Sequence, residues 1–255
     1  RSPPLPLARI SWVPPLQFEA ITGKLKFKAS TIEFGKPSWW EAWIKRSEFS
    51  YTGEPYQNLF CGGTSVSNYC HAYFRGDGSY PDNELFIYLD NGGSQYWHGR
   101  TQHQFRDTSA WYHLVIAVDT TLSTANDRVK VYVNGEQQTP TETGYQNISQ
   151  NADTRVNSAV EHEIGKYTFA EVHGMQYAEY FHGYMSDMYV IDGSAKAPTD
   201  FGEFDTNGVW IPKAYGGSYG TNGFFLDFAD AADLGDDESG NGNDWTEVNL
   251  TAADQ

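Results

Sequence analysis

Residues 111–119 read Trp-Tyr-His-Leu-Val-Ile-Ala-Val-Asp, and residues 129–135 read Val-Lys-Val-Tyr-Val-Asn-Gly. The first stretch is apolar on both faces at its centre, which is typical of a central strand covered on both sides. The second stretch alternates, so its three valines share one face. Asn134-Gly135 then supplies the positive φ angles of a type I′ turn, and we expect the chain to reverse there.

Further strand signals follow one another along the chain, separated by Gly-rich turns. Residues 39–45 alternate, with Trp40, Ala42 and Ile44 on one face. The other strand candidates run over Asn58 to Cys61, Cys70 to Phe74, Glu84 to Asp90, His182 to Ile191 and Phe224 to Phe228. Short, turn-linked strands with an aromatic content of 16% predict an all-β, two-sheet antiparallel jelly-roll sandwich with negligible helix.

The chain of 255 residues fits one large sandwich with short appendages. Residues 1–17 carry five prolines, so we expect an extended arm that is either loose or laid on a neighbouring subunit. We place the sandwich domain at residues 18–228. Residues 229–255 form an acidic, turn-rich tail, which is either a tail or the start of a further repeat.

The formal net charge is −16, which opposes binding to phosphate backbones and anionic lipid. No apolar run approaches the roughly 20 residues of a membrane span. We therefore expect neither nucleic acid binding nor membrane insertion, while neutral sugars and divalent cations remain compatible with the charge. Cys61 and Cys70 leave two alternatives, a bridged hairpin or two reduced thiols.

Five segments, in order over about residues 30 to 192, resemble the laminin-G-like branch of the concanavalin A-like lectin and glucanase superfamily. They are Trp40 to Lys45, Trp111 to Asp119, Val129 to Gly135, Glu163 to Gly165, and Phe181 to Met188. In the last segment Ser186 stands where the family has an acidic residue, and Asp187 keeps the second one. The resemblance implies a concanavalin A-like jelly roll that binds or scaffolds.

Two segments, Phe105 to His113 and Gly220 to Phe224, resemble the version of this domain that is common in bacteriophage structural proteins. That resemblance implies a non-enzymatic virion-surface structural or host-recognition module, such as part of a tail fibre, a spike or a capsid-associated protein. We then expect a homo-oligomer or association with other virion proteins, host-surface glycans as ligands, and a virion-surface or extracellular location. A cellular extracellular lectin or adhesin module is the alternative. Asp236 to Asp244 also resembles the opening of a laminin-G-like domain.

A glycoside hydrolase is the second alternative. Glucanases of the superfamily carry Glu-x-Asp-x-x-Glu on one strand, and retaining hydrolysis needs two carboxyl groups about 5–5.5 Å apart. Here Glu203-Phe204-Asp205 begins such a run, but Gly208 stands at the third acidic position. Glu161 and Glu163 share a strand face without the central Asp. We therefore predict no catalytic residues, and we expect His113 to be a packed residue.

Glycan binding would use aromatic rings on loops beside polar side chains. Tyr96 and Trp97 are the leading candidates, because adjacent residues of an extended chain point to opposite faces and only one ring can enter the core. Gln95 and His98 would hydrogen-bond sugar hydroxyls. The remaining candidates are Tyr80, Asp82, Tyr177 and Tyr180. The alternatives are packing at the sandwich rim and contact with a neighbouring subunit.

One segment has the oxygen-rich pattern of a calcium loop. Asp237, Ser239 and Asn241 alternate and are followed by Gly242, as at the opening of such a loop. The acid expected at the twelfth position is replaced by Val248, so an EF-hand is not matched. Calcium is therefore the single cofactor that the sequence suggests, and a polar turn is the alternative.

Overall fold

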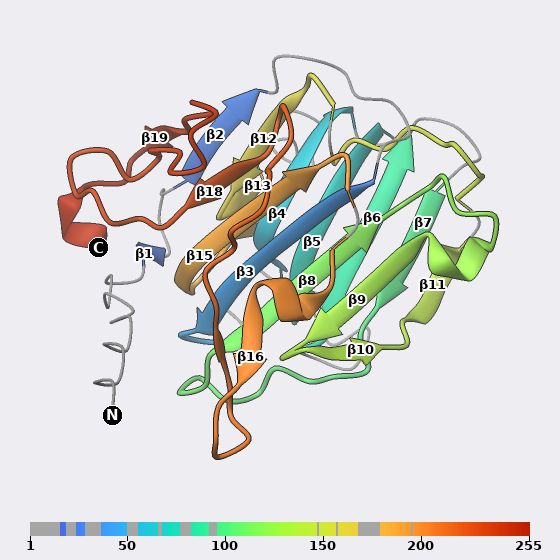
Figure 1. Cartoon of the computed structure of the whole chain (residues 1–255), viewed down its shortest axis with the longest axis horizontal. Coiled ribbons are helices and arrows are strands. Elements are labelled where there is room, and N and C mark those ends of the chain that lie inside the picture. Colours follow the sequence, from blue (N-terminus) through green and yellow to red (C-terminus); the bar gives the residue numbers. More distant parts are fainter. Residues whose placement is uncertain are drawn as a thin grey trace, which may run out of the picture.

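The structure is a computed structural model, and it describes residues 16–18, 24–28, 37–49, 56–65, 68–76, 83–91, 96–146, 148–156, 158–167, 179–194 and 196–255. Within these ranges two large antiparallel sheets face each other across one core (Figure 1). Among the described residues, helix is limited to single 3₁₀ turns: η1 (Ala125–Asp127), η2 (Pro198–Asp200) and η3 (Ala252–Asp254). The predicted all-β, two-sheet jelly-roll sandwich is confirmed.

The first sheet, called sheet A, has the strand order β1-β15-β3-β8-β9-β10, and β18 also pairs with β15. Its strands are β1 (Leu16–Phe18), β3 (Ser38–Arg46), β8 (Tyr112–Val118), β9 (Val129–Val133), β10 (Glu136–Gln138), β15 (Gly183–Asp192) and β18 (Phe224–Leu226). The stretches that carry the strongest strand signals, β3, β8 and β9, are direct neighbours in this sheet.

The second sheet, called sheet B, has the strand order β11-β7-β6-β5-β4-β12-β2-β19. Its strands are β2 (Lys24–Lys28), β4 (Tyr56–Ser65), β5 (Asn68–Arg75), β6 (Leu85–Asn91), β7 (Tyr96–Arg100), β11 (Thr141–Gln146), β12 (Glu161–Ile164) and β19 (Thr246–Val248). Four of these strands, β4 to β7, follow one another in both sequence and space, so they form a meander.

The core lies between the two sheets and is filled by every second residue of their strands. Trp40, Ala42 and Ile44 all enter it from β3, as the alternation predicted. Val129, Val131 and Val133 enter it from β9. Asn134 and Gly135 then adopt φ angles of 50° and 79°, and the chain reverses into β10. The predicted hairpin turn is confirmed.

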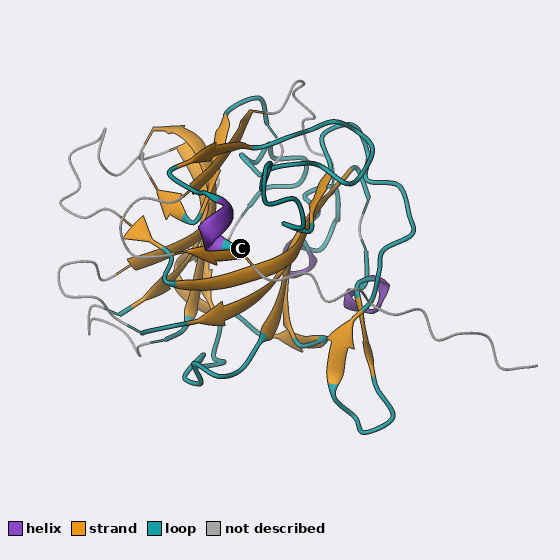
Figure 2. Cartoon of the chain, turned by 90° about the vertical axis from the view of Figure 1, so that its left-hand side faces the viewer, coloured by secondary structure: helices purple, strands orange, loops and turns teal. Residues whose placement is uncertain are grey.

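A third layer covers part of the outer face of sheet A. It contains the hairpin of β16 (Gly202–Phe204) and β17 (Trp210–Pro212), which lies in front of the sheet in Figure 1 and stands out from the strand layers in Figure 2. A second apolar cluster fills the space beneath this layer, with Val115, Tyr189, Ile191 and Phe201 at its centre. Because Val115 faces this cluster, β8 is buried on both faces.

A buried chain of hydrogen bonds holds the hairpin to sheet A. The indole N–H of Trp210 donates to Nδ1 of His113 at 3.1 Å. Because an indole N–H can only donate, the neutral imidazole carries its proton on Nε2 and donates to Oε2 of Glu41 at 2.9 Å. His113 and Glu41 are fully buried, so the packed role predicted for His113 matches its position.

The segment after residue 228 contributes to the sandwich. Strand β19 extends sheet B by pairing with β2. Leu234 and Trp245 are buried in the main core cluster, and Trp245 meets Phe224 edge to face at 5.0 Å. At the other end, β1 pairs with β15, and residues 1–15 of the expected proline-rich arm lie outside the described residues.

Both cysteines are buried thiols with no disulfide between them. In the register of the two strands, Cys61 of β4 lies opposite His71, and Cys70 of β5 lies opposite Gly62. Successive residues of a strand face opposite sides, so the two thiols lie on opposite faces of sheet B. Cys70 lies in the main core, where burial raises its pKa to about 12, and Cys61 packs beside Tyr167 on the other face. Of the two alternatives, the structure has the reduced pair.

The buried histidines predict how stability depends on pH. Burial lowers the pKa of His113 to about 3 and also lowers the pKa of His162. An unfolded histidine takes up a proton near pH 6.5, so below that pH the unfolded chain binds more protons than the folded one. We expect the free energy of unfolding to fall as the pH drops from about 6.5 towards 3.

Urea unfolding at several pH values between about 5 and 7 measures this effect before most carboxylates titrate. His113→Gln should be less stable at pH 7, because the variant loses the buried imidazole, and its stability should depend less on pH. Equal pH slopes for the wild type and the variant would contradict the assignment of a neutral, buried His113.

Candidate functional site

A continuous set of rings covers the face of sheet B that points away from the core. Residues of β4 to β7 alternate between the two faces, and Tyr167 of β13 (Lys166–Tyr167) packs onto the outer one. We call this set the outer aromatic face. It comprises Tyr56, Tyr69, His71, Tyr73, Phe86, Tyr88, His98 and Tyr167.

The rings contact one another across the strands. His71 stacks on Tyr73 with centroids 4.2 Å apart, and Tyr167 lies 4.5 Å from His71. Tyr73 meets Tyr88 edge to face at 5.6 Å, and Tyr88 stacks on His98 at 4.1 Å. These contacts join β5, β6 and β7 into one aromatic surface with fixed ring orientations.

Burial divides the outer aromatic face into a base and an accessible part. His71, Tyr73, Phe86 and Tyr167 are buried. The half-buried rings are Tyr56, Tyr69, Tyr88 and His98. The buried Tyr73 contacts the half-buried Tyr88, which in turn stacks on His98. Tyr88 and His98 are therefore packed against neighbouring rings and keep part of their surface in solvent.

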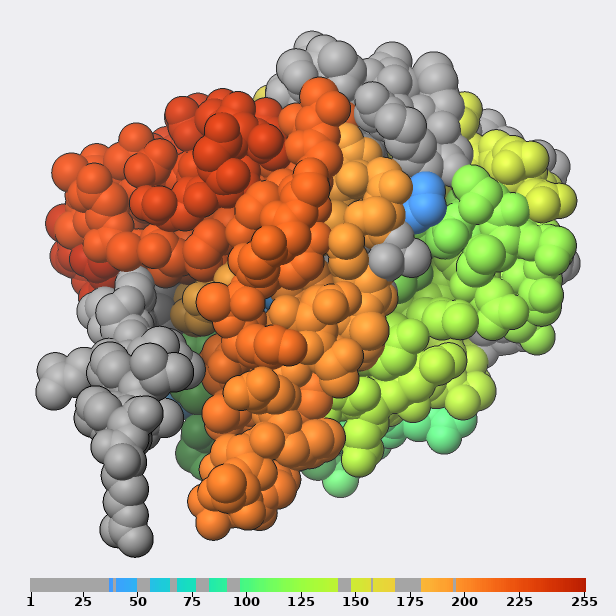
Figure 3. Space-filling view, viewed as in Figure 1, coloured from blue at the N-terminus to red at the C-terminus, as the bar shows by residue number. Residues whose placement is uncertain are grey.

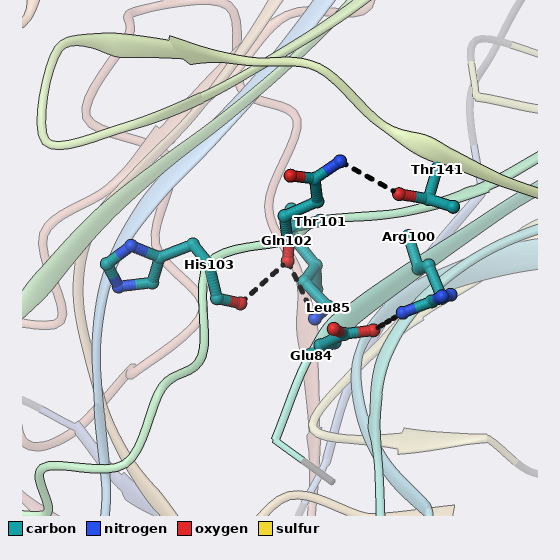
Figure 4. A network of polar contacts seen from close by, with 7 residues as sticks. All are labelled: Glu84, Leu85, Arg100, Thr101, Gln102, His103 and Thr141. Carbon is teal, nitrogen blue, oxygen red and sulfur yellow. Dashed lines mark hydrogen bonds and ion pairs between the residues drawn. The ribbon is translucent and has the colours of Figure 1, made fainter. Parts of the chain in front are cut away.

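Charged groups border the rings. The Arg75 guanidinium lies 5.5 Å from the centroid of Tyr56 and 5.7 Å from that of Phe86. Arg100, next to Phe86 in the sheet register, forms an ion pair with Glu84, and the two side chains point towards each other in Figure 4. The surface thus combines aromatic faces with groups that donate and accept hydrogen bonds.

Hydrogen bonds fix the chain that carries Arg100 (Figure 4). The Thr101 hydroxyl accepts a bond from the amide of Leu85 and donates to the carbonyl of His103, both at 3.1 Å. The amide side chain of Gln102 donates to the Thr141 hydroxyl at 3.2 Å. The ends of β6, β7 and β11 are therefore tied together beside the ion pair.

His98 is partly withdrawn from solvent. Burial lowers its pKa, and the nearby Asp90 carboxylate acts in the opposite direction. Its Nε2 atom is buried, so a ligand on the surface of the sheet meets the rest of the ring and not this nitrogen. The His98 ring is thus both a partner in the stack with Tyr88 and a polar group at the edge of the outer aromatic face.

The predicted sugar-binding residues divide into three groups. Trp97 is buried in the main core, so it is the ring of the Tyr96-Trp97 pair that enters the core, and a ligand on the outer face would not contact it. His98 lies on the outer aromatic face. Tyr180, on β14 (Glu179–Tyr180), is buried with the Lys166 ammonium 4.6 Å from its ring centroid. The remaining candidate side chains lie outside the described residues: Tyr80, Asp82, Gln95, Tyr96 and Tyr177.

The sequence analysis missed most of the outer aromatic face. Its signal is an aromatic or imidazole ring at every second position, at 69, 71 and 73 and again at 86 and 88. That alternation has the same period as the core pattern but lies one residue out of step with it. It could have been recognised as a second face of the same strands.

The predicted calcium loop is folded around the carboxylate of Asp237. Its Oδ1 accepts the amides of Phe225 and Ser239, and its Oδ2 accepts the Ser239 hydroxyl and the Asn243 amide. The Asn241 side chain donates to the carbonyls of Gly220 and Gly223. Within the described ranges no group of three or more His, Cys, Asp and Glu residues is placed to hold a metal ion. The geometry favours the polar-turn interpretation.

The acidic pairs weighed for hydrolysis are differently placed. Glu163 is fully buried, while Glu161 on the same face of β12 is exposed. Glu203 is exposed on β16, and the Asp205 carboxylate accepts hydrogen bonds from the backbone amides of Asn207 and Val209 in the hairpin turn.

The part of the chain that is described contains no helix long and apolar enough to span a membrane.

Comparison with known proteins identifies the fold family. The sequence profile of the concanavalin A-like lectin/glucanases superfamily matches residues 22–199. A protein from Bacteroides ovatus ATCC 8483, provisionally described as carbohydrate-binding, superposes with a TM-score of 0.51 at 18% identity, over 93% of this chain and 59% of its own. No curated protein matches the sequence.

Two further solved structures are similar. The native heptameric SAP-like pentraxin of Limulus polyphemus has a TM-score of 0.48 at 18% identity, over 71% of this chain and 76% of the pentraxin. The enzymatically active domain of bacteriophage CBA120 tailspike protein 2 has a TM-score of 0.46 at 14% identity, over 69% of this chain and 25% of that one.

The division between Trp97 and His98 can be tested by stability. Trp97→Ala should lower the free energy of unfolding by about 3–5 kcal/mol, because it leaves a cavity in the core. His98→Ala removes a half-buried ring and should cost about 1 kcal/mol. Urea unfolding of both variants measures the difference, and a larger loss for His98→Ala would reverse the assignment of faces.

The role of Asp237 is tested separately. Asp237→Ala leaves the amides of Phe225, Ser239 and Asn243 without their acceptor, so we expect a loss of about 2–4 kcal/mol in unfolding free energy. Thermal melts with calcium and with EDTA should coincide for the wild type. A calcium-dependent rise in Tm that Asp237→Ala abolishes would instead support the calcium site.

Proposed function

The chain belongs to the concanavalin A-like lectin/glucanases superfamily, and from this premise we propose that it is a non-enzymatic module that binds glycans on the outer aromatic face of sheet B. The observation that carries this proposal is the half-buried pair of Tyr88 and His98, stacked at 4.1 Å and packed against the buried Tyr73 ring.

The chemistry of this surface suits a sugar. The C–H face of a pyranose packs on an aromatic ring, and its hydroxyls need donors and acceptors in fixed positions. Tyr88 and His98 offer ring faces on paired positions of β6 and β7, and the partly exposed Asp90 carboxylate follows two residues after Tyr88. Because these groups stand on strands, binding requires little ordering of the protein.

The same placement supports a role without catalysis. Glycoside hydrolysis needs two carboxyl groups that reach the glycosidic bond. Of the pair on β12, Glu163 is fully buried, so a polymer bound at the sheet surface cannot reach it in this conformation. Glu84 is paired with Arg100.

We propose further that this module works as a structural or host-recognition part of a virion surface, or in another extracellular setting, as a homo-oligomer or beside other virion proteins. The support is the resemblance of residues 105–113 and 220–224 to bacteriophage structural proteins. The competing proposal is a cellular lectin or adhesin module. Neighbouring capsid, portal or tail genes would favour the first, and carbohydrate-utilisation genes the second.

A glycan array tests the binding proposal. The wild type should bind at least one glycan, and Tyr88→Ala and His98→Ala should each weaken that binding by about tenfold or more, the value of one lost stacking contact. Leu122→Ala, at an exposed apolar side chain away from the outer aromatic face, serves as the matched control and should bind as the wild type does.

Two results would overturn the proposal. A wild type that binds nothing on a broad array would leave a purely structural role, and folded Tyr88 and His98 variants with unchanged binding would exclude this surface. Release of reducing ends from a polysaccharide panel, abolished by Glu161→Gln or Glu163→Gln, would contradict the absence of catalysis.

A further inference from the structure

A second aromatic surface lies on the outer face of sheet A, on the other side of the molecule from the outer aromatic face. Tyr184 of β15 pairs with Lys45 of β3, and Ile44 pairs with Tyr112. One step further along the same register, Lys45 lies opposite Trp111. Ile44 and Tyr112 are buried in the core, so Lys45 and Trp111 point outward.

We call Tyr184, Lys45 and Trp111 the sheet A row. All three side chains are half-buried. The rings of Trp111 and Tyr184 are 6.5 Å apart between centroids and inclined at 58°, and the Lys45 ammonium lies 5.5 Å from the centroid of Tyr184. The cation therefore lies beside the Tyr184 ring, which contacts the Trp111 ring, and both rings keep part of their surface accessible.

The β16–β17 hairpin stands next to this row. Its Trp210 packs on His113 of β8, two residues after Trp111, which directly precedes that strand. Phe204 packs edge to face on Trp210 at 4.9 Å, yet 59% of its surface is exposed. In Figure 3 the orange hairpin projects forward, and the surface beside it is set back. The buried hydrogen bond from Trp210 to His113, which itself bonds Glu41, fixes the hairpin beside the row.

The charge of the sheet A row differs from that of the chain as a whole. The protein carries a net charge of −16, and Lys45 places a cation beside the Tyr184 ring. Asp107 senses this cation: its pKa is lowered mainly by hydrogen bonds from Ser109 and to a smaller extent by Lys45. The Lys45 ammonium has three N–H donors, so it can donate to a further anionic partner.

We propose that the sheet A row is a second ligand site, which takes a saccharide that carries a carboxylate. The sugar ring stacks on Trp111, and its carboxylate pairs with the Lys45 ammonium. This inference adds to the proposed function a site on the opposite sheet, and it does not depend on the site at Tyr88 and His98.

The net charge limits which acidic saccharides fit. A dense polyanion is repelled by a surface of net charge −16, whereas a short oligosaccharide with one carboxylate feels that repulsion only within the screening length of about 8 Å at physiological salt. The site is therefore expected to favour single uronate or sialate residues over polysaccharides that carry a charge on each residue.

An array of paired oligosaccharides tests the proposal, with each pair differing only in whether one residue bears a carboxylate. The wild type should bind the acidic member of at least one pair about tenfold more tightly than the neutral member at 150 mM salt. Lys45→Gln should abolish that preference, Trp111→Ala should abolish binding to the acidic member, and Trp111→Phe should restore part of it. Thermal melts check that each variant is folded.

Tyr88→Ala separates this inference from the proposed function. It should leave the preference for acidic glycans unchanged, while Trp111→Ala should leave binding at the outer aromatic face unchanged. The inference is overturned if no acidic member is preferred, if folded Lys45→Gln keeps the preference, or if Tyr88→Ala and not Trp111→Ala removes it. If no glycan binds at Tyr88, the proposed function fails, while the preference of the sheet A row for acidic glycans is still measured by the Lys45 and Trp111 variants.

Discussion

The hydrogen-bonded register of β4 to β7 is the constraint on which the rest of the structure depends. Once these strands pair, each residue is committed to one of two faces, and a shift by one residue would exchange them. Ile87, Leu89 and Trp97 then fill the core, and Tyr88 and His98 stack outside it. The core and the outer aromatic face are therefore two sides of the same register. Gly99 contributes to it, because a Cβ there would lie 2.5 Å from the Trp97 ring.

The two sheets differ in what covers their outer faces. Much of sheet A lies under the β16–β17 hairpin and the cluster of Tyr189 and Phe201, and the half-buried rings of Trp111 and Tyr184 lie outside that cluster. Sheet B carries rings from β4 through β7 with charged groups at their margin. This asymmetry gives one molecule two aromatic surfaces that face apart, a broad one and a small one that contains a cation.

The sequence predicted the features that depend on local pattern. The alternation around Ala42 and Val131 could be predicted from the two-residue period of side chains along a strand. The turn at Asn134 could be predicted from the backbone φ angles that its residues adopt. Contacts between distant segments had no local signal. Arg46 is fully buried, and its guanidinium donates to neutral acceptors on distant segments, among them the side-chain oxygen of Asn83 and the carbonyl of Phe105. The burial of Trp97 could not be predicted for a related reason. Alternation shows that one ring of an adjacent pair is buried, but it does not show which one.

The central claim, that a glycan binds on the outer aromatic face, is tested most directly by histidine NMR. The seven histidines include His71 and His98 on this face, and His113 and His162, which are buried elsewhere. During titration with the oligosaccharide that gives the strongest array signal, the account predicts that the ring signals of His98 and His71 shift together and saturate, while those of His113 and His162 stay in place. Saturable binding that leaves the His98 and His71 signals unmoved would contradict the account.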